Sequence, residues 1–260
     1  MPLLLTIDVG NTNTVLGVHD GEDLKAHWRL TTRREQTADE YGILVRSLFA
    51  ASSIDVAQIV GIALASVVPP LTSVVVTLCR TYLGHEPLVI EPGVKTGMPI
   101  LYEPPSDVGA DRIVNGVAAF AAYGGPVIVV DFGTATTFDV VTKKGEYIGG
   151  VICPGVGISA DALFQRAARL PRVDLRSPGK VIGRSTVGSI QSGLYFGYAS
   201  MVEGIIKRIR AELGEPARAV ATGGLAESLA ADVPSIEAVE PVLTLTGLRL
   251  IWGRNRAAAR

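Results

Sequence analysis

The feature that most constrains this chain is a short pattern that occurs twice. Residues 8–14 read DVGNTNT and residues 131–137 read DFGTATT. Each copy follows an apolar stretch typical of a buried strand, at 3–7 and 127–130, and precedes another run of β-forming residues. A single Asp-X-Gly is ordinary turn chemistry. Two copies at equivalent places predict one structural device that is used twice.

The order of the predicted elements repeats in the same way. The first half predicts strands and helices in this order: strands 3–8, 14–19 and 24–30, a helix after the capping box Thr37–Glu40, strand 60–65, a helix from Pro70, strand 87–90 and helix 108–123. The second half predicts strands 127–131, 137–141 and 147–152, helices 159–168 and 189–213, strand 217–221, and helices 225–231 and 243–254. The pattern indicates an α/β fold with two duplicated domains, 1–124 and 125–260, and a cleft between them.

Composition limits the partners of the chain. Of its 260 residues 48% are hydrophobic and 19% charged, the formal net charge is −1, and the pI is about 6.3. These values give no electrostatic reason to expect a nucleic-acid or anionic-membrane partner. The low charge content also leaves room for a buried interface between subunits.

Residues 59–79 contain no charge and are long enough to span a bilayer. However, Pro69 and Pro70 stand in the middle of this segment, and proline removes backbone donors. We therefore predict a strand, a turn and a helix there, in a soluble cytoplasmic protein.

The cysteines and histidines carry no metal pattern. Cys79 and Cys153 stand alone, which is typical of small buried hydrophobic residues in a reducing compartment. His19, His27 and His85 match no zinc spacing.

The two turns have the composition of a phosphate site. Glycine lets a phosphate approach the backbone closely, and the small polar side chains of Asn11, Thr12, Asn13 and Thr134 add donors without bulk. The carboxylate at the strand end is suited to Mg²⁺ or to a monovalent cation. Two facing turns would hold a nucleotide from both sides.

Other glycine motifs are weaker. Thr222-Gly223-Gly224 lies between a predicted strand and helix, where glycine would let a base or ribose approach. No G-x-x-x-x-G-K-[ST] occurs, which excludes a P-loop. Residues 155–160 match G-x-G-x-x-A, but Pro154 precedes them and a Pro- and Gly-bearing region follows, so we predict a helix start that lines the cleft.

Taken together, these motifs resemble the type III pantothenate kinases of the acetate and sugar kinase, actin-like superfamily. The specific marks are Asp8-Val-Gly-Asn-Thr12, Gly109-Ala-Asp-Arg112 and Asp131-Phe-Gly-Thr-Ala-Thr136, supported by Ser66-Val-Val-Pro-Pro70, Gly149-Gly-Val-Ile-Cys-Pro-Gly155 and Thr222-Gly-Gly224. The resemblance covers essentially the whole chain. It implies two duplicated ribonuclease-H-like domains with mixed sheets flanked by helices.

The resemblance also implies an activity. Such an enzyme transfers the γ-phosphoryl group of ATP to the primary hydroxyl of pantothenate, the first step of coenzyme A synthesis, and works as a homodimer. The implied ATP contacts are Asp8, Val9, Gly10, Asn11, Thr12, Asn13, Thr134 and Gly223. Asp8 would lie near Mg²⁺, and Asp131 would bind a monovalent cation, K⁺ or NH₄⁺. The implied pantothenate contacts are Tyr102, Gly109, Ala110, Asp111, Arg112 and Thr186.

Several of these roles have plainer alternatives. Asp111 is the candidate general base, although an acidic residue also suits a helix N-terminus because of the helix dipole. Arg112 could bind the pantothenate carboxylate, or pair with Asp107 or Asp111. Tyr102 could simply cover the core, and Thr186 could cap a helix.

Two other functions fit the same motifs. One is a regulatory relative that binds nucleotide but has lost phosphotransfer, and the other is a kinase of this fold that acts on another small alcohol. The intact turns and the intact 109–112 motif favour the pantothenate kinase.

Overall fold

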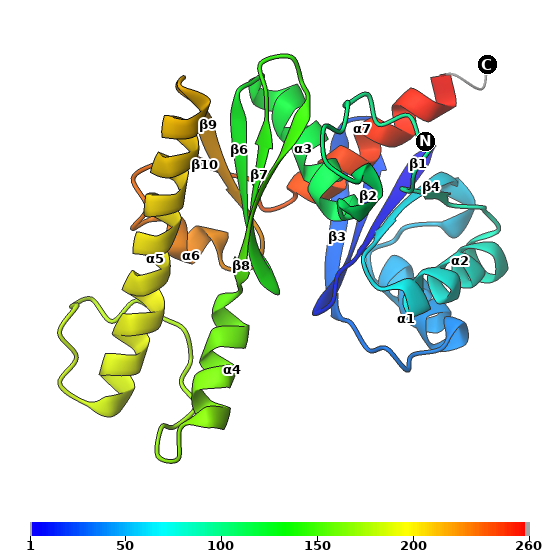
Figure 1. The fold of residues 1–260 in the computed structure, drawn as a ribbon. Coiled ribbons are helices and arrows are strands. Elements are labelled where there is room, and N and C mark those ends of the chain that lie inside the picture. The colour runs from blue at the N-terminus through cyan, green and yellow to red at the C-terminus, as the bar shows by residue number, and fades with distance from the viewer. Residues whose placement is uncertain (1, 258–260) are drawn as a thin grey trace. The chain divides into compact units, whose positions relative to one another are not determined.

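The structure is a computed structural model that describes residues 2–257 (Figure 1). The chain forms two compact units. The first contains residues up to 98, residues 102–118 and the residues from 243 on; the second contains residues 99–101 and 119–242.

The first unit is built on a five-stranded mixed sheet in the order β3-β2-β1-β4-β5. Its strands are β1 (Leu3–Val9), β2 (Asn13–Asp20), β3 (Asp23–Thr31), β4 (Ile59–Ser66) and β5 (Leu88–Val89). Its helices are α1 (Ala38–Ala51), α2 (Pro69–Leu83), the start of α3 (Ala110–Tyr123) and α7 (Leu243–Ala257), with 3-10 turns at Val56–Gln58 and Pro105–Asp107. Strands β1 and β2 pair antiparallel, whereas β1 and β4 are parallel, so β1 and β4 end at the same edge of the sheet.

Alternation along β1 sends its side chains to the two faces of this sheet. Leu5 and Ile7 belong to the core that includes Phe49 of α1 and Leu71 of α2. Each side chain of this kind stabilises the unit by about 1.5–3 kcal/mol on burial.

Helix α7 packs closely on the same sheet. A Cβ atom added to Gly17 of β2 would lie 2.8 Å from Leu245, and one added to Gly61 of β4 would lie 2.3 Å from Trp252. The strands therefore need glycine where the helix contacts them. The hydroxyl of Thr244 also donates to Oδ1 of Asn115, 2.8 Å away, which joins α7 to α3.

The second unit repeats this sheet, in the order β10-β9-β6-β7-β8. Its strands are β6 (Val127–Phe132), β7 (Ala135–Val141), β8 (Tyr147–Pro154), β9 (Arg218–Thr222) and β10 (Ile236–Val239). Its helices are α4 (Val156–Arg166), α5 (Thr186–Leu213) and α6 (Ala226–Ala230), together with the end of α3. Strand β6 pairs antiparallel with β7 and parallel with β9, as β1 does with β2 and β4.

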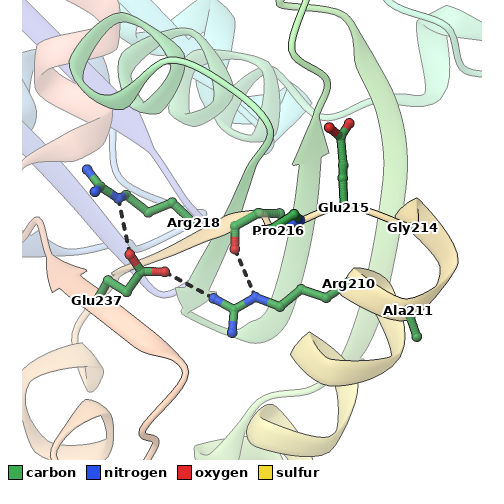
Figure 2. A pocket seen from close by; sticks show the side chains of 8 residues that line it. Arg210, Ala211, Gly214, Glu215, Pro216, Arg218 and Glu237 are labelled. Carbon is green, nitrogen blue, oxygen red and sulfur yellow. Dashed lines mark hydrogen bonds and ion pairs between the residues drawn. The ribbon is translucent and has the colours of Figure 1, made fainter.

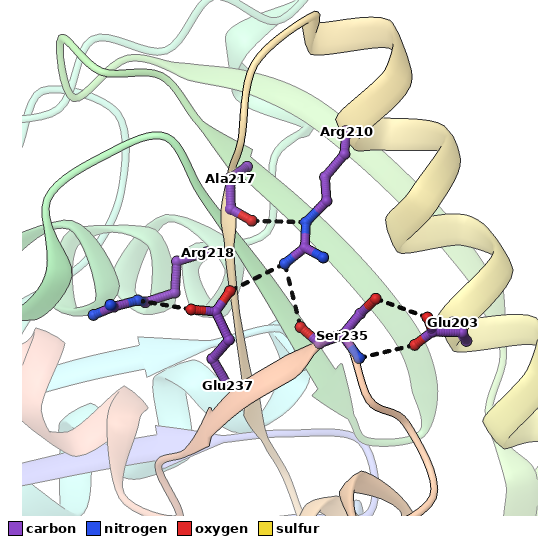
Figure 3. Close-up of polar contacts among 6 residues, drawn as sticks. All are labelled: Glu203, Arg210, Ala217, Arg218, Ser235 and Glu237. Carbon is purple, nitrogen blue, oxygen red and sulfur yellow. Dashed lines mark hydrogen bonds and ion pairs between the residues drawn. The ribbon is translucent and has the colours of Figure 1, made fainter.

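Polar contacts fasten α5 to the sheet of the second unit (Figure 3). Arg210 donates from Nε to the carbonyl of Ala217 at 2.8 Å and from Nη2 to Glu237 at 3.1 Å. Glu203 accepts from the backbone and the hydroxyl of Ser235, both at 2.9 Å. The long helix is thus fixed beside β9 and β10.

The predicted α/β fold class is confirmed, and both halves carry the same strand order. Every predicted strand and helix is present, including the capping box between Thr37 and Glu40. Strand β10 was missed, and α4 and α5 begin three residues earlier than predicted because Gly155 and Ser185 occupy the N-cap positions.

The division of the chain differs from the predicted ranges 1–124 and 125–260. Helix α7 comes last in the sequence, yet it belongs to the first unit. Periodicity predicts that this helix has an apolar face, but it does not specify which sheet the face covers.

The uncharged segment 59–79 forms strand β4 and most of helix α2, as predicted. Within residues 2–257, no helix combines the length and the apolar character needed to cross a bilayer.

The two cysteines differ. Cys79 is buried in the core of the first unit, and burial raises its pKa to about 12. Cys153 is only half-buried, so the prediction of two buried cysteines is right for Cys79 alone.

Candidate active site

The first Asp-X-Gly turn joins β1 to β2 at the carboxyl end of β1. Asp8 is half-buried and pairs with Val15 in register, and Val9 is buried. The N–H of Gly10 donates to the carbonyl of Asn13 at 3.0 Å, which closes a tight turn. Asn11 and Thr12 at its tip are exposed, so their polar groups can meet a ligand from solvent.

Three separate segments of the first unit meet at this sheet edge. The N–H of Val67, just after β4, donates to the carbonyl of Val9 at 3.0 Å. A Cβ atom added to Gly109, just before α3, would lie 3.6 Å from Cγ1 of Val67. The 109–112 motif therefore starts its helix beside the strand end that follows Asp8, and the structure brings together these two predicted sets of residues.

Asp111 stands in the first turn of α3 and is half-buried. Its Oδ1 accepts from the backbone N–H of Arg112 at 2.8 Å. Burial raises the pKa of Asp111, and the hydrogen bond and the charge of Arg112 offset part of this rise. A carboxylate whose pKa is shifted upward is a better proton acceptor near neutral pH than an ordinary aspartate.

Arg112 and Tyr102, both in the first unit, differ in burial. Arg112 is buried, with 8% of its surface exposed, and Tyr102 is half-buried after the segment 99–101. Burial of a guanidinium requires hydrogen-bonding partners, so Arg112 is held in place and not spread on the surface. Its predicted contact with the acceptor carboxylate stays a prediction.

The second Asp-X-Gly turn, between β6 and β7, stands at the equivalent strand end and is one residue shorter than the first. Asp131 pairs with Thr222 of the parallel strand β9 and is half-buried. The N–H of Gly133 donates to the carbonyl of Ala135 at 3.0 Å, and Thr134 at the tip is exposed.

Two glycines pack against the second turn. A Cβ atom added to Gly223, which has a φ of +94°, would lie 2.5 Å from Oδ1 of Asp131 and 2.7 Å from the backbone of Phe132. The N–H of Gly155, before α4, donates to the carbonyl of Thr134 at 3.1 Å. Asp131, Thr134 and Gly223 therefore lie together, as the sequence predicts.

Comparison with known proteins decides what these turns belong to. A sequence model of the type III pantothenate kinases matches residues 4–208. A type III pantothenate kinase of Moorella thermoacetica is 57% identical over 253 residues, which cover 97% of this chain and 100% of the relative. The chain belongs to the type III pantothenate kinase family.

Two solved structures share the fold of this pantothenate kinase family member. Component A of the (R)-2-hydroxyglutaryl-CoA dehydratase of Acidaminococcus fermentans aligns with a TM-score of 0.58 at 12% identity, over 99% of this chain and 100% of that one. The inorganic polyphosphate/ATP-glucomannokinase of Arthrobacter sp. strain KM aligns with a TM-score of 0.51 at 14% identity, over 98% of this chain and 100% of that one. At such identities the likeness is one of fold alone.

Thr186, a predicted pantothenate contact, lies on a helix and not at the end of a strand. It is exposed and is the first residue of α5. The helix cap is Ser185, whose hydroxyl accepts from the N–H of Gly188 at 3.1 Å, so the alternative role of Thr186 as the cap is wrong. Its side chain is left available for other contacts.

A surface hollow elsewhere in the second unit is a poor alternative site (Figure 2). It lies at the C-terminal end of α5 and includes Arg210, Arg218 and Glu237. Both arginines donate to Glu237, at 3.1 and 3.2 Å, so the charged groups of this hollow already pair with one another. None of the predicted site residues lines this hollow.

Two contacts at the turns were missed from the sequence. Thr32, just after β3, donates from its hydroxyl to the carbonyl of Gly10 at 2.8 Å, and Gly155 supports Thr134 as described above. The residues 149–155 that carry Gly155 were singled out by the family resemblance. Nothing local marks Thr32, which is one of two adjacent threonines at a strand end.

Proposed function

We propose that this protein phosphorylates pantothenate with ATP, giving 4′-phosphopantothenate and ADP, at the start of coenzyme A biosynthesis. The observation that carries the proposal is the Asp-X-Gly turn, built twice at equivalent strand ends in a chain of this family. We propose ATP contacts in each unit taken by itself: Asp8–Asn13 in the first unit, and Thr134 with Gly223 in the second.

In this mechanism the hydroxyl oxygen of pantothenate forms a bond to the γ-phosphorus of ATP, and the bond from that phosphorus to the bridging β–γ oxygen breaks. ADP leaves with the electron pair. Asp111 takes the proton of the hydroxyl, so the charge and the atoms balance. Phosphoryl transfer depends mainly on alignment and on stabilisation of phosphate charge, and one positioned carboxylate is the base that it needs.

The acceptor would be held beside this base. We propose that Tyr102, Gly109, Ala110 and Thr186 contact pantothenate, and that Arg112 binds its carboxylate through two parallel hydrogen bonds. Because Asp111 directly precedes Arg112, the position of the base would then be fixed relative to the carboxylate of pantothenate.

The carboxylates at the strand ends fit cations. Carboxylate oxygens are the hard donors that Mg²⁺ and alkali cations take, and we propose Asp8 for Mg²⁺ and Asp131 for K⁺ or NH₄⁺. Glycine at 223 leaves Oδ1 of Asp131 uncovered on one side, because a Cβ atom there would lie 2.5 Å from that oxygen. The cations would supply positive charge next to the phosphates.

We also propose a homodimer. Large apolar side chains are exposed on α4, on the segment after it and at the start of α5: Ile158, Phe164, Val181, Ile182 and Val187. Ile182 is 83% exposed, which is costly in water unless a partner covers it. Light scattering coupled to gel filtration should give twice the mass of 27.3 kDa; a monomer at micromolar concentration would contradict this part of the proposal.

The activity is tested by measuring ADP formed with and without pantothenate, Mg²⁺ and K⁺. ADP formation that depends on pantothenate supports the kinase. Nucleotide binding without turnover would support a regulatory relative, and turnover with another small alcohol from a panel would support a different kinase.

The role of Asp111 is tested by Asp111→Asn, which should lower kcat by about 10³-fold because the base is lost. Burial raises the pKa of Asp111, so ionised Asp111 is less stable in the folded protein than in the unfolded chain. The variant should therefore unfold at the same temperature as the wild type or a higher one.

Asp107→Asn is the matched control, because Asp107 is exposed four residues earlier and should not affect kcat. Full turnover by Asp111→Asn would remove Asp111 from the chemistry.

A further inference from the structure

The first turn is supported from one side by the short segment that follows β3. The N–H of Thr32 donates to the carbonyl of Thr12 at 2.9 Å. Its hydroxyl donates to the carbonyl of Gly10 at 2.8 Å. Nη2 of Arg34 lies 3.4 Å from Oδ1 of Asn11. Acceptor atoms of three consecutive turn residues are thus contacted by residues 32–34.

The number of hydroxyl hydrogens determines which threonine, Thr14 or Thr32, donates to the other. The oxygens of Thr14 and Thr32 lie 2.9 Å apart, and either could donate. A threonine hydroxyl has one hydrogen, and that of Thr32 points to Gly10, so Thr14 must donate to Thr32. Thr14 is buried, with 2% of its surface exposed. Two consecutive hydrogen bonds, from Thr14 to Thr32 and from Thr32 to the carbonyl of Gly10, therefore have a fixed direction and end on the turn.

Because the peptide between Gly10 and Asn11 is planar, fixing the Gly10 carbonyl also fixes the direction of the Asn11 N–H. In a trans peptide the carbonyl of one residue and the N–H of the next point in opposite directions. When Thr32 holds the carbonyl of Gly10, the N–H of Asn11 must point away from Thr32. A fixed N–H binds a phosphate oxygen better than one that must first be ordered.

We propose that Thr32 is a positioning residue for nucleotide binding: its hydroxyl orients the Gly10–Asn11 peptide so that the N–H of Asn11 faces the ATP phosphates. This rests on the proposed function of the first turn. Thr32 itself does not touch the nucleotide in this role.

The hydroxyl is not needed to hold the strands together. Strands β2 and β3 are paired along their length, from Asn13 opposite Thr31 to Asp20 opposite Asp23. Loss of one hydroxyl beyond the end of this ladder should change the turn more than the sheet. That separates a positioning role from a general structural one.

The test uses Thr32→Val, which keeps the shape but removes the hydroxyl, and Thr32→Ser, which keeps the hydroxyl. Thr32→Val should weaken ADP binding, measured by calorimetry, by about 10-fold, the loss expected for one oriented hydrogen bond. The KM for ATP should rise by a similar factor, while the KM for pantothenate stays within about 2-fold. Thr32→Ser should restore most of the affinity.

Thr31→Val is the matched control, because Thr31 is the neighbouring threonine and is exposed. This variant should bind ADP as tightly as the wild type does. Equal ADP affinity in Thr32→Val and the wild type would overturn the proposal. So would equal losses in Thr32→Val and Thr32→Ser, because they would point to packing and not to the hydroxyl.

Failure of the proposed function gives different results. A wild type that binds ADP without pantothenate-dependent turnover would contradict the kinase, yet the ADP comparison would still decide the role of Thr32. A wild type that binds no nucleotide would overturn both proposals.

Discussion

The two Asp-X-Gly turns occupy equivalent places in their sheets but differ in closure and in support. The N–H of Gly10 bonds to the carbonyl of Asn13, three residues on, whereas that of Gly133 bonds to the carbonyl of Ala135, two residues on. In the first, the hydroxyl of Thr32 holds the carbonyl of Gly10. In the second, the backbone N–H of Gly155 holds the carbonyl of Thr134, and Gly223 packs against Asp131. Side-chain support can be removed by changing a few atoms, whereas backbone support is disturbed only when a Cβ atom is forced in. The first turn also receives backbone hydrogen bonds, from Thr32 to Thr12 and from Val67 to Val9. The difference between the turns is therefore the side-chain contact of Thr32, which a single substitution can remove.

The strongest way to break the second turn is Gly155→Ala. The new Cβ atom would lie 2.2 Å from the carbonyl oxygen of Thr134 and 2.6 Å from that of Gly133, and backbone atoms cannot rotate away. Overpacking of this kind should lower the free energy of unfolding by about 3 kcal/mol, measured by urea titration.

Gly157→Ala is the control for this change. Gly157 lies in the first turn of the same helix, α4, with nothing within 4 Å of the new Cβ atom. Alanine there should stabilise the protein by about 0.5–1 kcal/mol, because it favours the helix. A Gly155→Ala protein as stable as Gly157→Ala would show that the second turn is not rigid.

The next largest expected difference between the two units is in their stability at acid pH. His19 of β2 is buried with 2% exposed; its Nε2 lies 3.1 Å from the hydroxyl of Thr6, and its Nδ1 has no partner among the described residues. Burial, helped by the charge of Arg249, lowers its pKa to about 4 from 6.5. Because the unfolded chain binds the proton more readily, stability is complete above pH 6.5 and falls as the pH drops to 4, by about 3 kcal/mol in total.

Amide hydrogen exchange at pH 7 and at pH 5 measures this effect, after correction for the intrinsic exchange rate. Protection in β1 and β2 should fall more at pH 5 than protection in β6 and β7. His19→Gln should remove the difference, whereas His27→Gln, on the exposed surface, should leave it. Equal loss of protection in both sheets would contradict the assignment to His19.

The smallest effect on stability is expected from Gly133→Ala, within the second turn itself. Its Cβ atom would lie 3.5 Å from the carbonyl of Ala135 and 3.6 Å from Asp131, which is ordinary contact. The free energy of unfolding should change by less than about 0.5 kcal/mol. If phosphate approaches this glycine, the KM for ATP should nevertheless rise. An unchanged KM for ATP would remove Gly133 from the proposed phosphate site. Thr134 would then be the residue of the second turn that is proposed to contact ATP.

The sequence by itself determined the types of element and the two turns. These depend on local information: alternation in strands, helical spacing after Thr37, proline at the start of α2, and Asp-X-Gly after an apolar strand. Local spacing also located the helix start near residue 108, whereas the motif 109–112 was singled out by its resemblance to the kinase family.

Only the tertiary structure decided which elements meet. The apolar face of α7 fits a sheet, but the glycines of β2 and β4 that receive Leu245 and Trp252 lie about 200 residues away in the chain. Gly10 and Thr32 are separated by 22 residues, and nothing near Thr32 signals that its hydroxyl ends on a turn. Such contacts depend on the packing of whole elements, and a local pattern of residues does not encode where those elements come to rest.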